Sequence, residues 1–316
     1  MKLRTWLIDG LIVIIVSAIF IIWYELKERD TVSTASLDPK NFKIYLLTMD
    51  RQDQFWHSLD RGAADMSELM GVRYRWVAPE TKDTDMQIEQ LKDIVSAGAS
   101  AILIAANDPV RMSGPIEDAK AKGIKIIYVD SPAYEEAIIT LSTDNYQAGA
   151  AAGKVMISEL EAIGIRTGRL GIVSVNKETD STMKREHGFR EVIERDGRYY
   201  IGDTKYAHGD PEASEAAAIE LITEYNDLVG LFGTNEGSSI GVGNAIKEVN
   251  KKLVGIGFDK SEEILELLKN NGLNAVLVQN PYTMGYLGVA EAVAALKGYD
   301  TGPDSINTGV SILLRP

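Results

Sequence analysis

Cysteine is absent from all 316 residues of the chain, and histidine occurs only three times. Without cysteine the protein can form neither a disulfide nor a thiolate metal site, and three histidines far apart in the sequence argue against a zinc site. The chain has fewer basic than acidic residues, with 33 Lys and Arg and 46 Asp and Glu, which gives a formal net charge of −13. A nucleic-acid surface needs a basic patch, so we expect no nucleic-acid partner.

Motifs of catalysis and of cofactor binding are also missing. The sequence has no P-loop, no nucleophile elbow and no metal-ligand spacing. One G-x-G occurs in residues 241–246, but it lies inside a predicted helix and lacks the third glycine of a dinucleotide-binding turn. Asp130 and Asp259 are conceivable as a glycosidase pair, yet nothing in the sequence defines their separation. We therefore predict no catalytic residue, no metal and no cofactor, and do not expect an enzyme.

One long hydrophobic run is present, at residues 6–24, just after Lys2 and Arg4. Nineteen residues at about 1.5 Å each match the thickness of a bilayer core. No small-x-small cleavage site follows the run closely, and aromatic residues stand near both of its ends. We predict an uncleaved signal anchor and linker in residues 1–40, a single transmembrane helix that holds an extracytoplasmic domain at the cell membrane. A cleaved signal peptide is the alternative.

From residue 42 onward, short apolar segments such as "FKIYLLT", "AILIAA", "IKIIYVD", "RLGIVSV" and "LVGIGFD" alternate with amphipathic ones. The stretch "MQIEQLKDIVSAG" has the apolar spacing of a helix and ends at a glycine. This alternation predicts parallel sheets with helices on both faces. Nine or ten strands exceed the five or six of an ordinary sheet, so the sequence predicts two α/β lobes.

Polar residues follow most of the predicted strands, and ligands of open parallel sheets bind at those carboxyl ends. A common alternative for each such residue is a helix N-cap. Together they predict a cleft of carboxylates and amides, which suits vicinal hydroxyls. The residues at these ends, with one nearby arginine, are Asp50, Asp53, Asn107, Asp108, Asp130, Arg185, Asn235, Glu236, Asp259, Gln279 and Asn280.

Two aromatic residues, Phe55 and Trp56, stand side by side in the charged segment "LTMDRQDQFWHSLDRGAADM". A sugar ring presents an apolar C–H face that packs against a flat aromatic surface. We therefore place this pair in the wall of the cleft. The alternative is that one of the two is the first core residue of the following helix.

Seven segments occur in this order along the chain: "DQFWHSLDRGA", "IIYVDSP", "LSTDNYQAGAAAG", "MKREHGFREVI", "LFGTNEGSSIGVGNAI", "GIGFDKSEEI" and "LVQNPYTMGYLGVAEA". As an ordered set they resemble the type I periplasmic sugar-binding proteins, which are ABC transporter substrate-binding proteins, and the ribose-binding ones are most alike in pattern. The resemblance covers residues 42–316. It implies two doubly wound parallel-sheet lobes, residues 41–143 with 280–305 and residues 144–279 with 306–316. Three chain crossings would join them, near residues 143–144, near 279–280 and before Asn307.

The resemblance also implies which residues bind the ligand. The aromatic pair would flank the sugar ring, and the arginine would donate hydrogen bonds to sugar oxygens. Two departures disfavour ribose itself but leave a pentose or a similar sugar: Ser131 replaces an arginine, and "HGDPEAS" lacks an aromatic residue found in some relatives. The implied ligand-binding residues are Asp53, Phe55, Trp56, Asp130, Arg185, Asn235, Asp259 and Gln279.

The function implied by this resemblance is the capture of a monosaccharide between closing lobes and its delivery to an ABC permease. An alternative is a sugar-sensing partner of a membrane histidine kinase in a two-component system, since a permanent anchor suits both roles. A repressor core of the same fold would need an N-terminal helix-turn-helix, and the hydrophobic run occupies that position.

Overall fold

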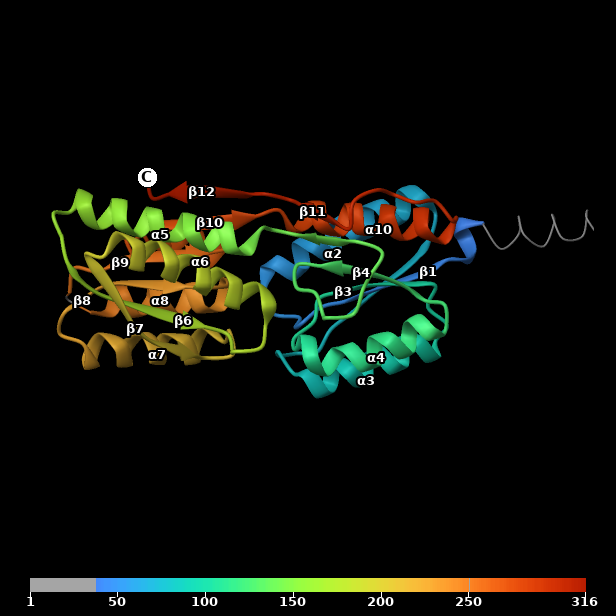
Figure 1. The fold of residues 1–316 in the computed structure, drawn as a ribbon, viewed down its shortest axis with the longest axis horizontal. Coiled ribbons are helices and arrows are strands. Elements are labelled where there is room, and N and C mark those ends of the chain that lie inside the picture. The colour runs from blue at the N-terminus through green and yellow to red at the C-terminus, as the bar shows by residue number, and fades with distance from the viewer. Residues whose placement is uncertain (1–37, 250) are drawn as a thin grey trace, which may run out of the picture.

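The computed structural model describes residues 38–249 and 251–316 and shows two α/β lobes side by side along the long axis of the molecule (Figure 1). A short 3-10 helix, η1 (Pro39–Asn41), precedes the first strand. The sheet of the first lobe has the order β11-β5-β4-β3-β1-β2, and all neighbouring strands in it are parallel. Its strands are β1 (Lys43–Leu47), β2 (Arg73–Val77), β3 (Ala101–Ile104), β4 (Lys125–Val129), β5 (Thr140–Ser142) and β11 (Ser305–Asn307).

The sheet of the second lobe has the order β12-β10-β9-β8-β6-β7. Its neighbours are parallel except for β12, which runs antiparallel to β10 at the edge. Its strands are β6 (Gly168–Ser174), β7 (Tyr199–Tyr206), β8 (Leu228–Gly233), β9 (Val254–Phe258), β10 (Ala275–Gln279) and β12 (Val310–Leu314).

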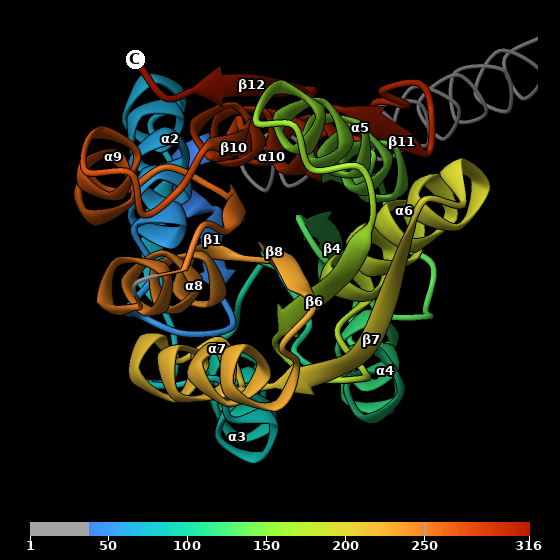
Figure 2. The same cartoon turned by 90° about the vertical axis from the view of Figure 1, so that its left-hand side faces the viewer.

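Helices cover both faces of each sheet, as the view along the long axis shows for the second lobe (Figure 2). Those of the first lobe are α2 (Gln54–Met70), α3 (Thr84–Ser96), α4 (Pro109–Ala121) and α10 (Pro281–Leu296). Those of the second lobe are α5 (Asn145–Ala162), α6 (Asp180–Asp196), α7 (Pro211–Glu224), α8 (Glu236–Glu248) and α9 (Glu262–Lys269).

The predicted two-lobe α/β architecture with parallel sheets is confirmed, but the number of strands was underestimated. Twelve strands occur in the described residues, against the nine or ten expected. The additional ones are β7, β11 and β12. β7 and β11 lack the short, continuous apolar pattern of a doubly buried strand, because each is an edge strand of its sheet. β12 is also an edge strand, although its VSILL sequence is largely apolar.

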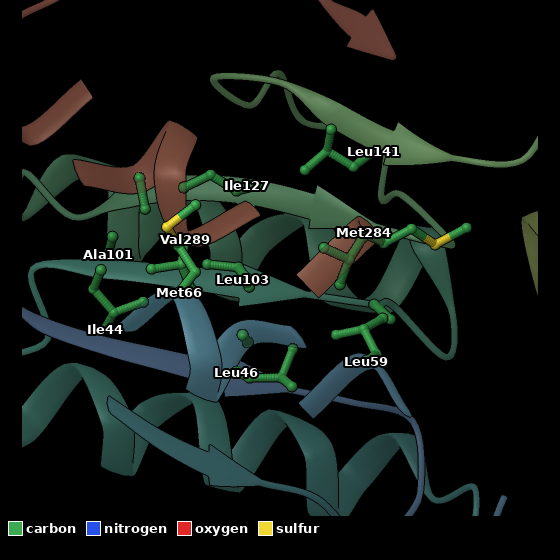
Figure 3. Packing of buried hydrophobic residues seen from close by; sticks show 14 of the residues in the cluster. Ile44, Leu46, Leu59, Met66, Ala101, Leu103, Ile127, Leu141, Met284 and Val289 are labelled. Atoms are coloured by element: carbon green, nitrogen blue, oxygen red, sulfur yellow. The ribbon is translucent and has the colours of Figure 1, made fainter. Parts of the chain in front are cut away.

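The central strands form the core because both of their faces are covered. All four residues of β3 are buried, and its "AILI" sequence has no polar member. On one face of the first sheet, Ile44, Leu103 and Ile127 pack against Met284 and Val289 of α10 (Figure 3). A separate apolar cluster lies on the other face, beneath α3 and α4. This sandwich anchors the carboxyl ends of the strands, where the polar residues lie.

Close glycine contacts attach one helix pair in each lobe. A Cβ added to Gly62 of α2 would lie 2.0 Å from the carbonyl oxygen of Tyr282 in α10. A Cβ added to Gly149 of α5 would lie 2.0 Å from the carbonyl oxygen of Arg185 in α6. Only glycine permits such a close approach of two backbones. The contacts therefore set the positions of α2 and α6, the helices that carry the aromatic pair and the arginine.

The chain passes between the lobes after β5, after β10 and between β11 and β12. The third passage differs from the prediction, which placed it before Asn307. Ile306 and Asn307 pair with Leu141 and Ser142 of the first sheet, so the passage follows Asn307. The reason is burial, since the half-buried Ile306 packs against the core of the first lobe.

The predicted membrane anchor at residues 6–24 lies outside the described residues. Across residues 38–249 and 251–316, none of the helices combines the length and the apolar character needed to cross a bilayer.

Candidate functional site

A small cavity lies where the two lobes face each other. The eight residues predicted from the sequence all line it: Asp53, Phe55, Trp56, Asp130, Arg185, Asn235, Asp259 and Gln279. Six further residues complete the lining, namely Met49, Lys82, Val175, Thr179, Ser181 and Thr182.

Asp130 and Asp259 occupy corresponding places in the two lobes, directly after the central strands β4 and β9. Both have a positive φ, 60° for Asp130 and 74° for Asp259. This left-handed conformation is uncommon for residues other than glycine, although Asp adopts it more readily than most, and it often marks functional positions. Both side chains are buried, and burial raises the pKa of both, in the case of Asp130 to about 6.

The aromatic pair begins α2, just after the polar loop that follows β1. The rings of Phe55 and Trp56 meet edge to face, with centroids 4.8 Å apart. Both side chains line the cavity and both belong to the core cluster of the first lobe. The indole N–H of Trp56 donates to Asp50 Oδ2 at 2.9 Å, which fixes the ring plane. Both residues thus line the cavity and also belong to the core, whereas the sequence offered these placements as alternatives and placed only one of the two residues in the core.

Arg185 extends from α6 to the cavity and is only 2% exposed. Its Nε donates to Asn145 Oδ1 at 2.8 Å, and its Nη1 donates to the carbonyl oxygen of Thr234 at 3.0 Å. The guanidinium carbon lies 3.9 Å from the ring centroid of Phe258. These contacts leave Nη2 directed at Asp130, whose Oδ1 is 3.5 Å away. The guanidinium is thus held in one orientation before any ligand is considered.

Lys82 was missed by the sequence analysis, although it forms the most highly charged cluster of the site. Its ammonium lies 2.8 Å from Asp50 Oδ2 and 3.0 Å from Asp53 Oδ2. Burial alone lowers the pKa of Lys82, but the two carboxylates outweigh this effect and raise it. Burial raises the pKa of Asp53 to about 6, although the ammonium opposes the shift. Lys82 follows β2, so the rule of carboxyl strand ends could have found it.

Four buried polar atoms at the cavity have no hydrogen-bond partner among the described residues. Two of them, the donor Arg185 Nη2 and the acceptor Asp130 Oδ1, face each other as an ion pair at 3.5 Å without forming a hydrogen bond. The other two are the donor Asn235 Nδ2 and the acceptor Gln279 Oε1. Buried polar groups are nearly always paired in folded proteins. Donors and acceptors placed together in this way match a ligand whose groups both donate and accept, as hydroxyls do. Next to the aromatic pair, they form a surface suited to a polyhydroxylated ring.

Several polar residues that follow strands serve other roles. Asp108 accepts hydrogen bonds from the backbone N–H groups of Val110 and Arg111 and acts as a helix cap. Asn107 is buried and donates to the carbonyl oxygen of Met49. Neither residue lines the cavity. The helix-cap alternative is correct for Asp108.

A further carboxylate, Glu236, joins the lobes. Its two oxygens accept hydrogen bonds from the backbone N–H groups of Gln54 and Phe55, at 2.9 and 3.0 Å. Burial and the nearby Asp53 raise the pKa of Glu236 to about 8. The sequence indicated a polar residue here but not its contact with the other lobe.

Comparison with known proteins gives a consistent result. A family model described as a periplasmic binding protein domain matches residues 44–300. The ribose import binding protein RbsB of Bacillus subtilis is 25% identical over 261 residues, 82% of this chain and 83% of that protein. A solute binding protein of Agrobacterium radiobacter in complex with D-arabinose has a TM-score of 0.83 and 27% identity, with 87% of this chain and 94% of that one covered. One of Agrobacterium vitis with bound D-fucose has a TM-score of 0.81 and 27% identity, with coverages of 86% and 95%.

Proposed function

Since the chain belongs to the family of proteins with a periplasmic binding protein domain, we propose that it binds a monosaccharide outside the cytoplasm and delivers it to an ABC permease. The ligand would sit in the cavity between the lobes, which close around it. A pentose is favoured, in keeping with the D-arabinose bound by one structural relative and the ribose named for one sequence relative. The proposed ligand-binding residues are the eight predicted from the sequence.

The observation that carries this proposal is the set of four unpaired donors and acceptors beside the aromatic pair. Each would gain a partner from a sugar hydroxyl, which removes the free-energy penalty of an unsatisfied buried group. The same arrangement provides specificity, since a deoxy sugar leaves one of these groups unpaired. Acceptors from Asp130 of the first lobe and Gln279 at the crossing would then act with donors of Arg185 and Asn235 from the second lobe.

A thermal-unfolding screen of the full-length chain in nanodiscs tests the proposal, with pentoses, hexoses and their deoxy forms as ligands. A sugar at about one hundred times its dissociation constant adds about 2.7 kcal/mol to the free energy of unfolding. We expect at least one pentose to raise the unfolding temperature, and its deoxy form to have a smaller effect. The absence of any shift across the panel would contradict a sugar ligand.

The membrane tether is part of the proposal and is supported by the sequence of residues 6–24. We expect the protein in the membrane fraction to retain its N-terminal residues, which intact-mass spectrometry measures directly. A mature N-terminus beyond Tyr24 would show that the segment is a cleaved signal peptide. The same tether suits a sugar-sensing partner of a membrane histidine kinase, the second candidate. Co-purification with a permease or with a kinase distinguishes the two roles.

A further inference from the structure

Two helices that border the cavity, α2 and α6, begin without a side-chain cap. Six helices begin with a side chain that caps their own backbone N–H groups, namely α3, α4, α5, α7, α8 and α9, whereas α10 also lacks such a cap. The capping position of α2 is Asp53 and that of α6 is Thr179, and neither side chain makes such a bond. Asp53 is instead bound to Lys82. An N-terminal turn leaves backbone donors without intrahelical partners, so these two helices require partners from elsewhere.

The partner for α2 comes from the other lobe. Glu236, in the first turn of α8, accepts one hydrogen bond from each of the first two N–H groups of α2, those of Gln54 and Phe55. The side chain of Glu236 is only 4% exposed. A Cβ added to the adjacent Gly237 would lie 1.8 Å from the carbonyl oxygen of Gly209, so this close backbone contact fixes the start of α8. The carboxyl group is therefore held in place to meet α2.

The first turn of α6 makes the reciprocal contact. The backbone N–H of Ser181 donates to Ser131 Oγ at 3.3 Å, and the hydroxyl of Thr179 donates to the carbonyl oxygen of Asn107 at 2.9 Å. Both acceptors belong to the first lobe. Each lobe thus supplies acceptors to a helix start of the other, and all of these bonds depend on the lobes being closed.

We propose that Glu236 is a positioning residue of the sugar site, which stabilises the closed lobes by capping α2 and so orients Phe55 and Trp56 against the polar wall of the cavity. This inference rests on the proposed function above. Each of the two N–H donors, from Gln54 and Phe55, needs an oxygen acceptor, so both terminal atoms of the Glu236 side chain must be oxygens. A glutamine would turn its NH₂ group toward one of the two N–H donors, which leaves that donor unpaired and adds repulsion.

The test uses the full-length chain in nanodiscs, with one spin label on each lobe. The absence of cysteine allows the pair Met86→Cys on α3 and Ala216→Cys on α7, both at exposed positions, to be labelled without background. Distances are measured without sugar for the parent, Glu236→Gln, Glu236→Asp and Glu212→Gln. Glu212 is an exposed residue in the first turn of α7, in the same lobe, and provides the matched control.

We expect Glu236→Gln to shift the sugar-free distance distribution toward longer distances, and Glu212→Gln to leave it unchanged. Glu236→Asp keeps the carboxylate but is one methylene too short, so it should also open the lobes, and it provides a second variant if the first folds poorly.

Sugar titration adds an independent measurement. Glu236→Gln should raise the dissociation constant of the best sugar about tenfold, which corresponds to about 1.4 kcal/mol. A distance distribution of Glu236→Gln that coincides with the parent would overturn the capping role. If no sugar binds the parent but the variant still opens, the proposed function fails while the role of Glu236 in closure stands.

Discussion

Replacing Arg185 by lysine tests the site at its most constrained residue. The guanidinium makes three contacts: it donates hydrogen bonds to Asn145 Oδ1 and to the carbonyl oxygen of Thr234, and its Nη2 faces Asp130 in the cavity. A lysine keeps the positive charge but has a single nitrogen without the planar fork. It cannot reach all three acceptors at once. The substitution therefore removes hydrogen bonds of a buried cation while the net charge of the site stays constant.

The magnitude follows from the bonds that are lost. A hydrogen bond of a charged group is worth about 1.5–3 kcal/mol. The bonds to Asn145 and Thr234 exist without ligand, so losing one of them should lower the free energy of unfolding by about that amount. Nη2 faces Asp130 without a hydrogen bond and would donate one to bound sugar, so its loss should weaken binding by roughly 10- to 150-fold. Arg185→Lys should thus affect folding and binding separately.

Two assays separate these effects. Urea unfolding measures the loss of stability, and titration calorimetry with the best sugar of the screen measures the loss of affinity. Arg195→Lys is a matched control, because Arg195 lies on the same helix and its side chain is 77% exposed. It should change neither quantity measurably. If Arg185→Lys binds sugar with parental affinity, Nη2 makes no ligand contact and the assignment of the polar wall is wrong.

Two further substitutions test the other parts of the cavity. Trp56→Phe removes the indole N–H that Asp50 accepts but keeps an aromatic face, so it should lower the free energy of unfolding by about 1–2 kcal/mol and weaken sugar binding. Urea unfolding measures the stability and calorimetry the affinity. If the variant loses stability but binds sugar with parental affinity, Trp56 belongs to the core alone. The pKa of Asp53 is raised from 3.8 to about 6 in the folded protein. Between pH 3.8 and about 6 the folded state therefore binds more protons than the unfolded state, so the free energy of unfolding falls as the pH rises through this range. Asp53→Asn should flatten this fall and raise the free energy of unfolding at pH 7 by about 1–3 kcal/mol, whereas a loss of stability at pH 7 would show that its bond to Lys82 outweighs its burial.

The polar residues at the strand ends show the limit of sequence reasoning. The same residue type in the same local position has different roles, since Asp108 is a helix cap and Asp130 faces the cavity. Asn235 has both roles, because its Oδ1 caps α8 while its Nδ2 is left unpaired at the cavity. The residues at strand ends could be found from the pattern. Which atoms face a ligand depends on burial by the opposite lobe, which no local pattern encodes.

The sequence by itself determined the two-lobe α/β architecture, because strand and helix periodicity are local properties and parallel strands bring their carboxyl ends to one edge. That rule, together with the aromatic pair and the family resemblance, selected eight residues that line a single cavity, although their contacts with a sugar stay a prediction. Only the tertiary structure decided the contact of Glu236 with Gln54 and Phe55, more than 180 residues away. Likewise, the pairing of Lys82 with two carboxylates follows from how two loops pack together. Such contacts form only where two elements pack against each other. How the elements pack depends on the sum of all interactions across their interface, which no single segment of the sequence determines.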